Sequence, residues 1–160
     1  MVHESFLKRC IFGCGTRDAG LAPALLFLRG VIGAMMLVGH GLPKIATFAA
    51  LRDGWPVPDF FPLYFMSPAV SLMATIGAAV GAAVCLILGL MTRPAAFVLC
   101  FAMAVAAFDV CAAQPLFAMP ASGKELAVLY LVPVLMILFT GAGTWSLDAA
   151  ILREGKRRRW

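Results

Sequence analysis

Long apolar runs alternate with short polar segments along this chain. Four stretches, residues 21–38, 70–90, 95–113 and 126–139, hold almost no charged side chains, and residues 140–143 extend the last one. About 20 residues of α-helix are needed to cross roughly 30 Å of hydrocarbon. Because lipid cannot bond to backbone polar groups, each stretch is expected to be helical. The pattern predicts an all-α fold, a transmembrane four-helix bundle.

Proline residues fall between the apolar stretches, which favours helical hairpins. Three segments follow from this pattern: residues 1–20 before the bundle, the bundle itself at 21–143, and a tail at 144–160. In the tail, Ser146 is placed to cap a short amphipathic, basic helix. The connection at 45–67 is long and rich in aromatic residues, so it is expected to form an interfacial belt, to cover a pocket as a lid, or to do both.

The composition excludes an ordinary soluble domain. Hydrophobic residues make up 62% of the chain and charged residues 13%, against about 45–50% and about 25% in soluble proteins. The sequence has no phosphate-binding loop, GxSxG or HExxH motif, so hydrolase, kinase and metalloenzyme functions have no support and no metal site is expected. The five cysteines are scattered without a CxxC pair, and their roles stay open; they are Cys10, Cys14, Cys85, Cys100 and Cys111.

Lysine and arginine are distributed unequally between the two ends of the expected helices. Nine lie in the two terminal segments and the 91–94 turn, and three lie in the other two connections. The positive-inside rule therefore predicts that both termini are cytoplasmic and that the aromatic 45–67 loop is outside. A multi-pass protein of the cell's inner (plasma) membrane is expected. The net charge of +5 comes mostly from the tail, which favours contact with anionic lipid and not with nucleic acid.

Ionisable residues within the apolar stretches are the candidate functional residues, since each costs at least about 2.5–3.5 kcal/mol at mid-membrane. If the first helix continues through Lys44, then Arg29, His40 and Lys44 share one face, which cannot face lipid. Small residues in the same helix are expected to let a neighbouring helix approach closely. They are Gly30, Gly33, Gly39 and Gly41.

Two acidic residues at the outer ends of other helices, Asp109 and Glu125, are expected to lie near His40 and Lys44. Arg29 lies deeper, and the sequence names no partner for it. One interpretation is a set of structural salt bridges. The other is an outer-leaflet pocket that binds a small molecule or a quinone headgroup, with Arg29, His40, Lys44, Asp109 and Glu125 as the ligand-binding residues.

Five short motifs follow one another along the chain. They are Leu28-Arg29-Gly30-Val31-Ile32-Gly33, His40-Gly41-Leu42-Pro43-Lys44, Leu88-Gly89-Leu90-Met91-Thr92-Arg93, Gly123-Lys124-Glu125 and Gly141-Ala142-Gly143-Thr144-Trp145-Ser146-Leu147-Asp148. Each motif alone is weak, but in their order and spacing they resemble the DoxX family of four-helix membrane proteins. The resemblance covers about residues 25–148.

This resemblance implies a bundle associated with oxidoreductase systems, since the family includes the membrane subunit of thiosulfate:quinone oxidoreductases. A quinone cofactor and an oxidoreductase partner subunit are the corresponding expectations. The alternative is a non-catalytic scaffold or small-molecule carrier. The chain departs from the family by having no glutamate at 76–81 and by having Asp109 where relatives often carry histidine. Whether this chain is catalytic, and whether it forms a homo-oligomer, stay open.

Overall fold

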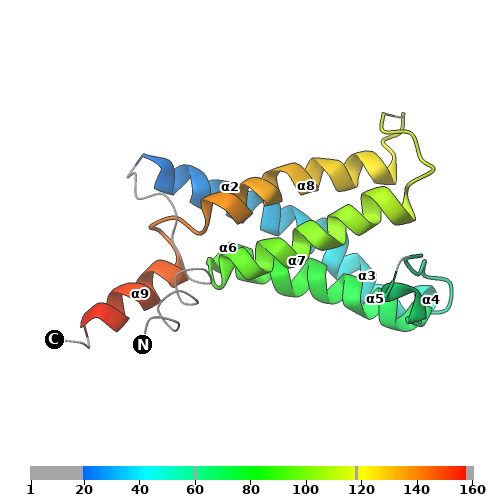
Figure 1. Ribbon diagram of the computed structural model, residues 1–160, viewed down its shortest axis with the longest axis horizontal. Coiled ribbons are helices and arrows are strands. Elements are labelled where there is room, and N and C mark those ends of the chain that lie inside the picture. The colour runs from blue at the N-terminus through cyan, green and yellow to red at the C-terminus, as the bar shows by residue number, and fades with distance from the viewer. Residues whose placement is uncertain (1–19, 60, 118, 158–160) are drawn as a thin grey trace.

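The computed structural model describes residues 20–59, 61–117 and 119–157, with side chains up to residue 153. Four long helices run lengthwise through the molecule (Figure 1). They span Leu21–Ala46, Pro68–Leu88, Thr92–Val110 and Gly123–Thr140, and each is long and apolar enough to cross a membrane. The all-α, four-helix prediction is therefore confirmed. The first helix does continue through Lys44 and ends at Ala46, eight residues beyond its predicted end at residue 38.

Each of the first three spanning helices is made of several helical segments. The first consists of α2 (Leu21–Met36), η1 (Leu37–Gly41) and α3 (Leu42–Ala46); the second of α5 (Pro68–Ile76), η3 (Gly77–Ala82) and α6 (Ala83–Leu88); the third of α7 (Thr92–Val105) and η4 (Ala106–Val110). The fourth is α8 (Gly123–Thr140). The first connection holds the short α4 (Phe48–Leu51) and η2 (Leu63–Phe65), and α9 (Leu147–Arg157) follows the bundle.

The segments η1, η3 and η4 are π-helical turns, wider than the α-helix on either side. A proline two residues beyond η1, Pro43, explains the first of them. Proline has no N–H and its ring clashes with the carbonyl four residues earlier, and an inserted wide turn relieves that clash. π-turns of this kind redirect the side chains that follow them and often occur at functional sites.

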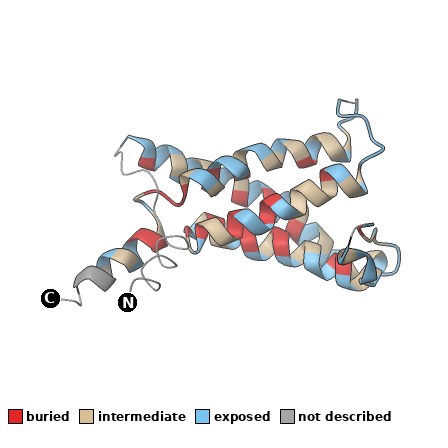
Figure 2. Cartoon of the chain, viewed as in Figure 1, coloured by how far each residue is buried: buried red, intermediate tan, exposed pale blue. Residues whose placement is uncertain are grey.

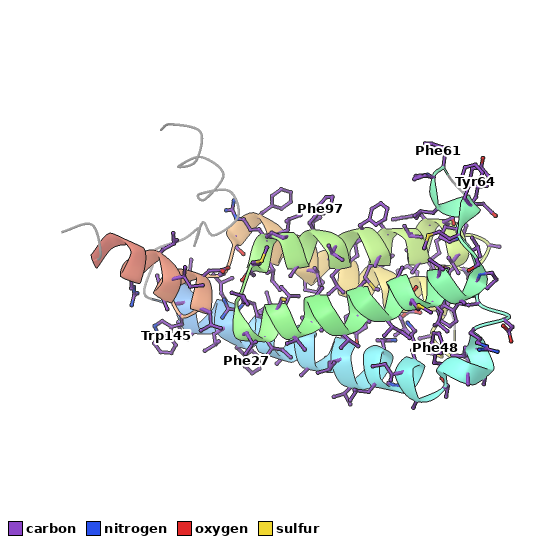
Figure 3. The ribbon with its side chains drawn as sticks, turned by 90° about the horizontal axis from the view of Figure 1, so that it is seen from below. Phe27, Phe48, Phe61, Tyr64, Phe97 and Trp145 are labelled. Carbon is purple, nitrogen blue, oxygen red and sulfur yellow. The ribbon has the colours of Figure 1, made fainter. Side chains whose placement is uncertain are left out.

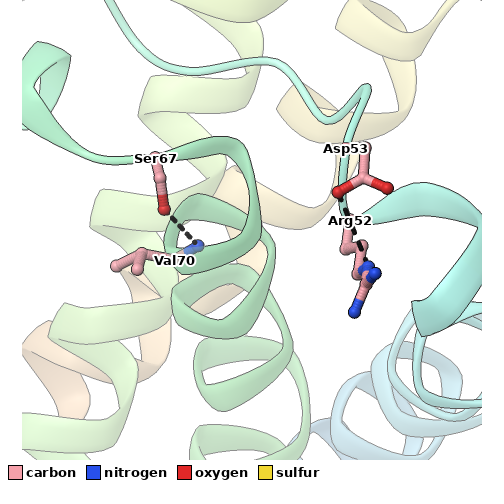
Figure 4. A network of polar contacts seen from close by, with 4 residues as sticks. All are labelled: Arg52, Asp53, Ser67 and Val70. Atoms are coloured by element: carbon pink, nitrogen blue, oxygen red, sulfur yellow. Dashed lines mark hydrogen bonds and ion pairs between the residues drawn. The ribbon is translucent and has the colours of Figure 1, made fainter.

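Helix ends are fixed by capping residues and by one left-handed glycine. Ser67 caps α5 by accepting a hydrogen bond from the Val70 amide at 3.4 Å (Figure 4), and Ser122 caps α8 through the Glu125 amide at 3.1 Å. Such caps satisfy amide groups that have no partner within the helix. Gly89 ends α6 with φ +66°, a conformation that glycine adopts without steric cost. The helix starts at Ser67 and Ser122 lie at one end of the bundle, and the turn at Gly89 lies at the other.

We call the end with the α6–α7 turn, the C-terminus of α8 and α9 the tail end, and the opposite end the distal end. Figures 1 and 3 both show α9 leading away from the bundle at the tail end. Ser146 caps α9, since its Oγ accepts a hydrogen bond from the Ala149 amide at 3.1 Å. The predicted cap of the tail helix is therefore present.

Apolar side chains cover the outside of the bundle as well as its core. The core is built mainly from small residues, with Met36, Leu86 and Leu99 among the few large ones. In the most apolar 18 residues of each spanning helix, only 17–39% of the residues are buried (Figure 2). The exposed Phe27 and Phe97 point away from the bundle (Figure 3). Exposed apolar patches much larger than a few hundred Å² are rare on soluble monomers, so a lipid environment accounts for this surface.

Two of the four predicted close-packing glycines face the second helix. A Cβ on Gly33 would lie 2.6 Å from Ile87 Cγ1 and 3.0 Å from the Ala83 carbonyl oxygen, and one on Gly41 would lie 2.8 Å from Val80 Cγ2. Nothing lies within 4 Å of a Cβ on Gly30 or Gly39, so the prediction was wrong for these two. Gly39 precedes Gly41 by two residues, and residues at that spacing face different sides of a helix.

Replacing Gly33 by valine should destabilise the bundle, because the new side chain must push α6 away. Overpacking of this kind costs about 1–3 kcal/mol. We expect a lower midpoint of thermal unfolding for Gly33→Val in detergent, measured by circular dichroism. Gly30→Val is the matched control and should unfold near the wild-type temperature. Equal midpoints for the two variants would contradict the packing described here.

Candidate functional site

A cavity of about 180 Å³ opens at the distal end of the bundle, between the first, third and fourth spanning helices. Most of its wall is apolar, and three side chains bring polar groups to it, an imidazole, an ammonium and a phenol. The lining residues are His40, Lys44, Met103, Ala106, Gly123, Leu126, Ala127 and Tyr130. Two of the five residues proposed from the sequence therefore lie together at one cavity.

His40 and Lys44 reach this cavity because η1 and α3 place them one turn apart on the same side of the first helix. The His40 ring meets the ring of Tyr130 edge to face, with centroids 5.2 Å apart and planes at 88°. Lys44 Nζ lies 5.4 Å from the centre of the Trp55 ring, a cation–π distance. Both polar side chains are thus held by aromatic neighbours from other parts of the chain.

Asp109 is directed to the first connection instead of the cavity. Its Oδ2 accepts a hydrogen bond from the backbone amide of Asp59 at 3.0 Å. Among the described residues, no carboxylate lies within 4 Å of His40 or Lys44. The ion pair found in that part of the chain joins the exposed Arg52 and Asp53 (Figure 4). Asp109 therefore forms no ion pair with His40 or Lys44 at that distance. Asp109 holds the loop, as does the Ser71 hydroxyl, which donates to the Pro56 carbonyl at 2.9 Å.

Glu125 lies in the first turn of α8, one residue before Leu126 of the cavity wall, but it is not itself one of the lining residues. The first connection also stays outside the wall, since no described residue of 47–67 lines the cavity. Its rings contact one another, with Tyr64 and Phe65 centroids 3.9 Å apart, and Phe61 and Tyr64 point away from the bundle (Figure 3). The described residues of the first connection therefore do not form part of the cavity wall.

Arg29 lies at the tail end, on the opposite side of the molecule from the cavity. Its side chain is 0% exposed, and its guanidinium donates hydrogen bonds to the carbonyl oxygens of Ala142 and, at 2.8 Å, of Trp145. Gly89 allows this approach, because a Cβ there would lie 2.9 Å from Arg29 Nη1. The partner that the sequence could not name is thus the backbone just after α8.

Asp148 completes the same cluster, and the sequence interpretation did not single it out. Its carboxylate is 1% exposed and accepts hydrogen bonds from the amides of Met91 at 2.7 Å and Thr92 at 3.0 Å. It thereby caps α7 from a distant part of the chain, where a negative charge is favourable. The one available signal was its place at the end of the 141–148 motif. Tyr130 was also missed, although a tyrosine in the middle of an apolar stretch was a signal for it.

The three cysteines within the described residues are free thiols. Cys100 is buried in the core and Cys85 packs against it, both as free thiols. Cys111 is a half-buried free thiol at the distal end, and no group of three metal-ligating residues occurs among the described positions. Cys10 and Cys14 lie outside the described residues.

Four spanning helices with a lipid-facing apolar surface define a multi-pass α-helical membrane protein. The chain belongs to the DoxX family, which it matches over residues 24–112. It is also 36% identical, over 132 residues, to a Haemophilus influenzae protein named only as an uncharacterized protein; the match covers 81% of this chain and 92% of that one. No solved structure matches the chain at a significant level.

Replacing Arg29 by methionine should loosen the tail end. The carbonyls of Ala142 and Trp145 would lose their donor, and a buried polar group left unpaired costs about 1–3 kcal/mol. We expect a lower midpoint of thermal unfolding and faster tryptic cleavage after Arg153 in α9. Arg52→Met removes an exposed ion pair worth less than about 1 kcal/mol and serves as the control. Unchanged stability and cleavage in Arg29→Met would show that the buried guanidinium does not hold this end.

Proposed function

We propose that the protein is a quinone-reactive membrane subunit of an oxidoreductase system, which holds a quinone headgroup in the distal cavity. One observation carries the proposal: His40, Lys44 and Tyr130 bring polar groups to an otherwise apolar cavity between helices that face lipid. Ligand sites of this kind are mostly apolar, with a few polar groups that fix orientation. Family membership supports an association with redox systems, and catalysis by this chain itself is not part of the proposal.

The chemistry of the cavity fits a quinone ring. Lysine, histidine and tyrosine can all donate hydrogen bonds, and a quinone presents two carbonyl oxygens as acceptors. The volume of about 180 Å³ lies below the ~300–1,000 Å³ typical of pockets that enclose a whole drug-sized ligand. The cavity therefore suits the headgroup, while an isoprenoid tail would stay among the lipid chains.

The other predicted site residues have supporting roles in this proposal. Asp109 anchors the first connection beside the cavity, and Glu125 lies in the first turn of α8 at its edge, where a carboxylate could exchange protons with a bound ligand. Arg29 acts at a distance by holding the four helices together at the tail end.

Quinone binding should depend on the cavity. Loss of the imidazole in His40→Ala removes one hydrogen bond, worth about 0.5–1.5 kcal/mol, which corresponds to up to about tenfold in affinity. Ala127→Leu should weaken binding further, since Ala127 is buried in the wall and the larger side chain fills the space. Binding of a short-chain ubiquinone analogue can be followed by quenching of tryptophan fluorescence in detergent. Ala74→Leu, on an exposed position of α5, is the control, and wild-type affinity in both cavity variants would overturn the proposal.

A second candidate function is a non-catalytic scaffold or small-molecule carrier. The observation that favours it is that His40 and Lys44 already have aromatic partners, Tyr130 and Trp55, which give them a structural role. In that case His40→Ala would lower the thermal stability of the bundle and leave quinone affinity unchanged. The same pair of measurements on one variant therefore separates the two functions.

We further propose that the bundle lies in the inner membrane with both termini in the cytoplasm, which places the cavity in the outer leaflet. The support is the excess of lysine and arginine at the tail end, as the positive-inside rule requires. A green fluorescent protein fused after Trp160 should then fluoresce, and alkaline phosphatase fused at the same place should be inactive. Active phosphatase would reverse the assigned orientation.

A further inference from the structure

Lys44 brings a positive charge to the cavity, and among the described residues no carboxylate lies at ion-pair distance from it. Its side chain is half-buried, and its ammonium faces the Trp55 ring. A partly buried cation without a counter-ion is costly, because burial removes water and an aromatic ring replaces it only in part. The missing partner can be supplied by a ligand.

The surroundings of Lys44 reinforce this positive character. The acid expected beside it, Asp109, is engaged by the Asp59 amide instead, and Glu125 is not a wall residue. The wall includes Gly123, Leu126 and Ala127 from the first turns of the 18-residue helix α8, whose N-terminus carries a partial positive charge. Hydrogen bonds from the Gly123 and Glu125 amides already go to Gln114 and Ser122, so α8 contributes through its field more than through direct contacts.

We infer that the distal cavity selects for headgroups that carry a negatively charged oxygen, with Lys44 as the residue that determines this selectivity. The inference rests on the proposed function, because it concerns the charge of the headgroup that the same cavity takes. An ionised hydroxyl on a quinone ring would meet the Lys44 ammonium, while His40 and Tyr130 donate to the remaining oxygens of the ring. Hydrogen bonds between charged groups are about twice as strong as neutral ones, so the preference should be large enough to measure.

Two probes of nearly the same shape test the charge alone. 2-Hydroxy-1,4-naphthoquinone is ionised at neutral pH, and its methyl ether, 2-methoxy-1,4-naphthoquinone, is uncharged. Their dissociation constants for the wild-type protein in detergent can be compared by fluorescence quenching at low and at high salt. We expect the ionised probe to bind about tenfold more tightly, and this advantage to shrink at high salt, where exposed charges are screened.

Lys44→Gln should abolish the preference while leaving the affinity for the methyl ether close to that of the wild type. Lys124→Gln is the matched control, since Lys124 lies two residues before Leu126 but donates to the Ala112 carbonyl at 3.0 Å and does not line the cavity. It should retain the preference. Thermal unfolding of both variants verifies that they are folded at the assay temperature.

The outcomes separate the inference from the proposed function. If both probes bind equally tightly to the wild type, the charge selectivity is wrong and the quinone site stands. If neither probe nor a ubiquinone analogue binds, the proposed function itself fails. A preference that survives Lys44→Gln but is lost in Lys124→Gln would place the anion subsite outside the cavity, and so would also overturn the inference.

Discussion

A fully buried guanidinium in a bundle that faces lipid must find its hydrogen-bond partners within the chain, and the tail end is arranged around this requirement. Arg29 comes from the first helix, its acceptors follow the fourth, and Gly89 in the turn between the second and third lets it approach. Asp148 of α9 caps the third helix beside it. All four spanning helices and α9 thus meet at one polar cluster, which fixes their order in the absence of a hydrophobic driving force between helices.

The distal end has a different construction, built around a cavity between three helices. Two π-turns widen the helices at this end. The turn η1 contains His40, and η4 contains both Ala106 of the cavity wall and Asp109, which binds the first connection. The polar side chains rest on aromatic rings instead of on carboxylates. The cluster around Arg29 and the residues that line the cavity thus lie at opposite ends of the bundle.

The hydrophobic pattern was sufficient to predict the four helices, because each must satisfy its backbone internally and show apolar side chains to lipid. It also placed His40 and Lys44 on one face, which the 3.6-residue period fixes. The partners of Arg29 were not predictable, since every residue has a carbonyl group and only the folded chain selects those of Ala142 and Trp145. The hydrogen-bond partner of Asp109 was not predictable for a related reason. Depth in the membrane can be inferred from sequence, but the wider turn of η4 and the path of the loop decide which amide its carboxylate meets.

The claim that the distal cavity is the quinone site can be tested most directly by photoaffinity labelling of the protein in native membranes with an azido-substituted ubiquinone. Peptide mapping by mass spectrometry then locates the label. The account predicts labelling in residues 37–46 or 123–130, which unlabelled ubiquinone prevents by competition. Labelling confined to the tail end near Arg29, or spread evenly over lipid-facing residues and insensitive to competition, would contradict it.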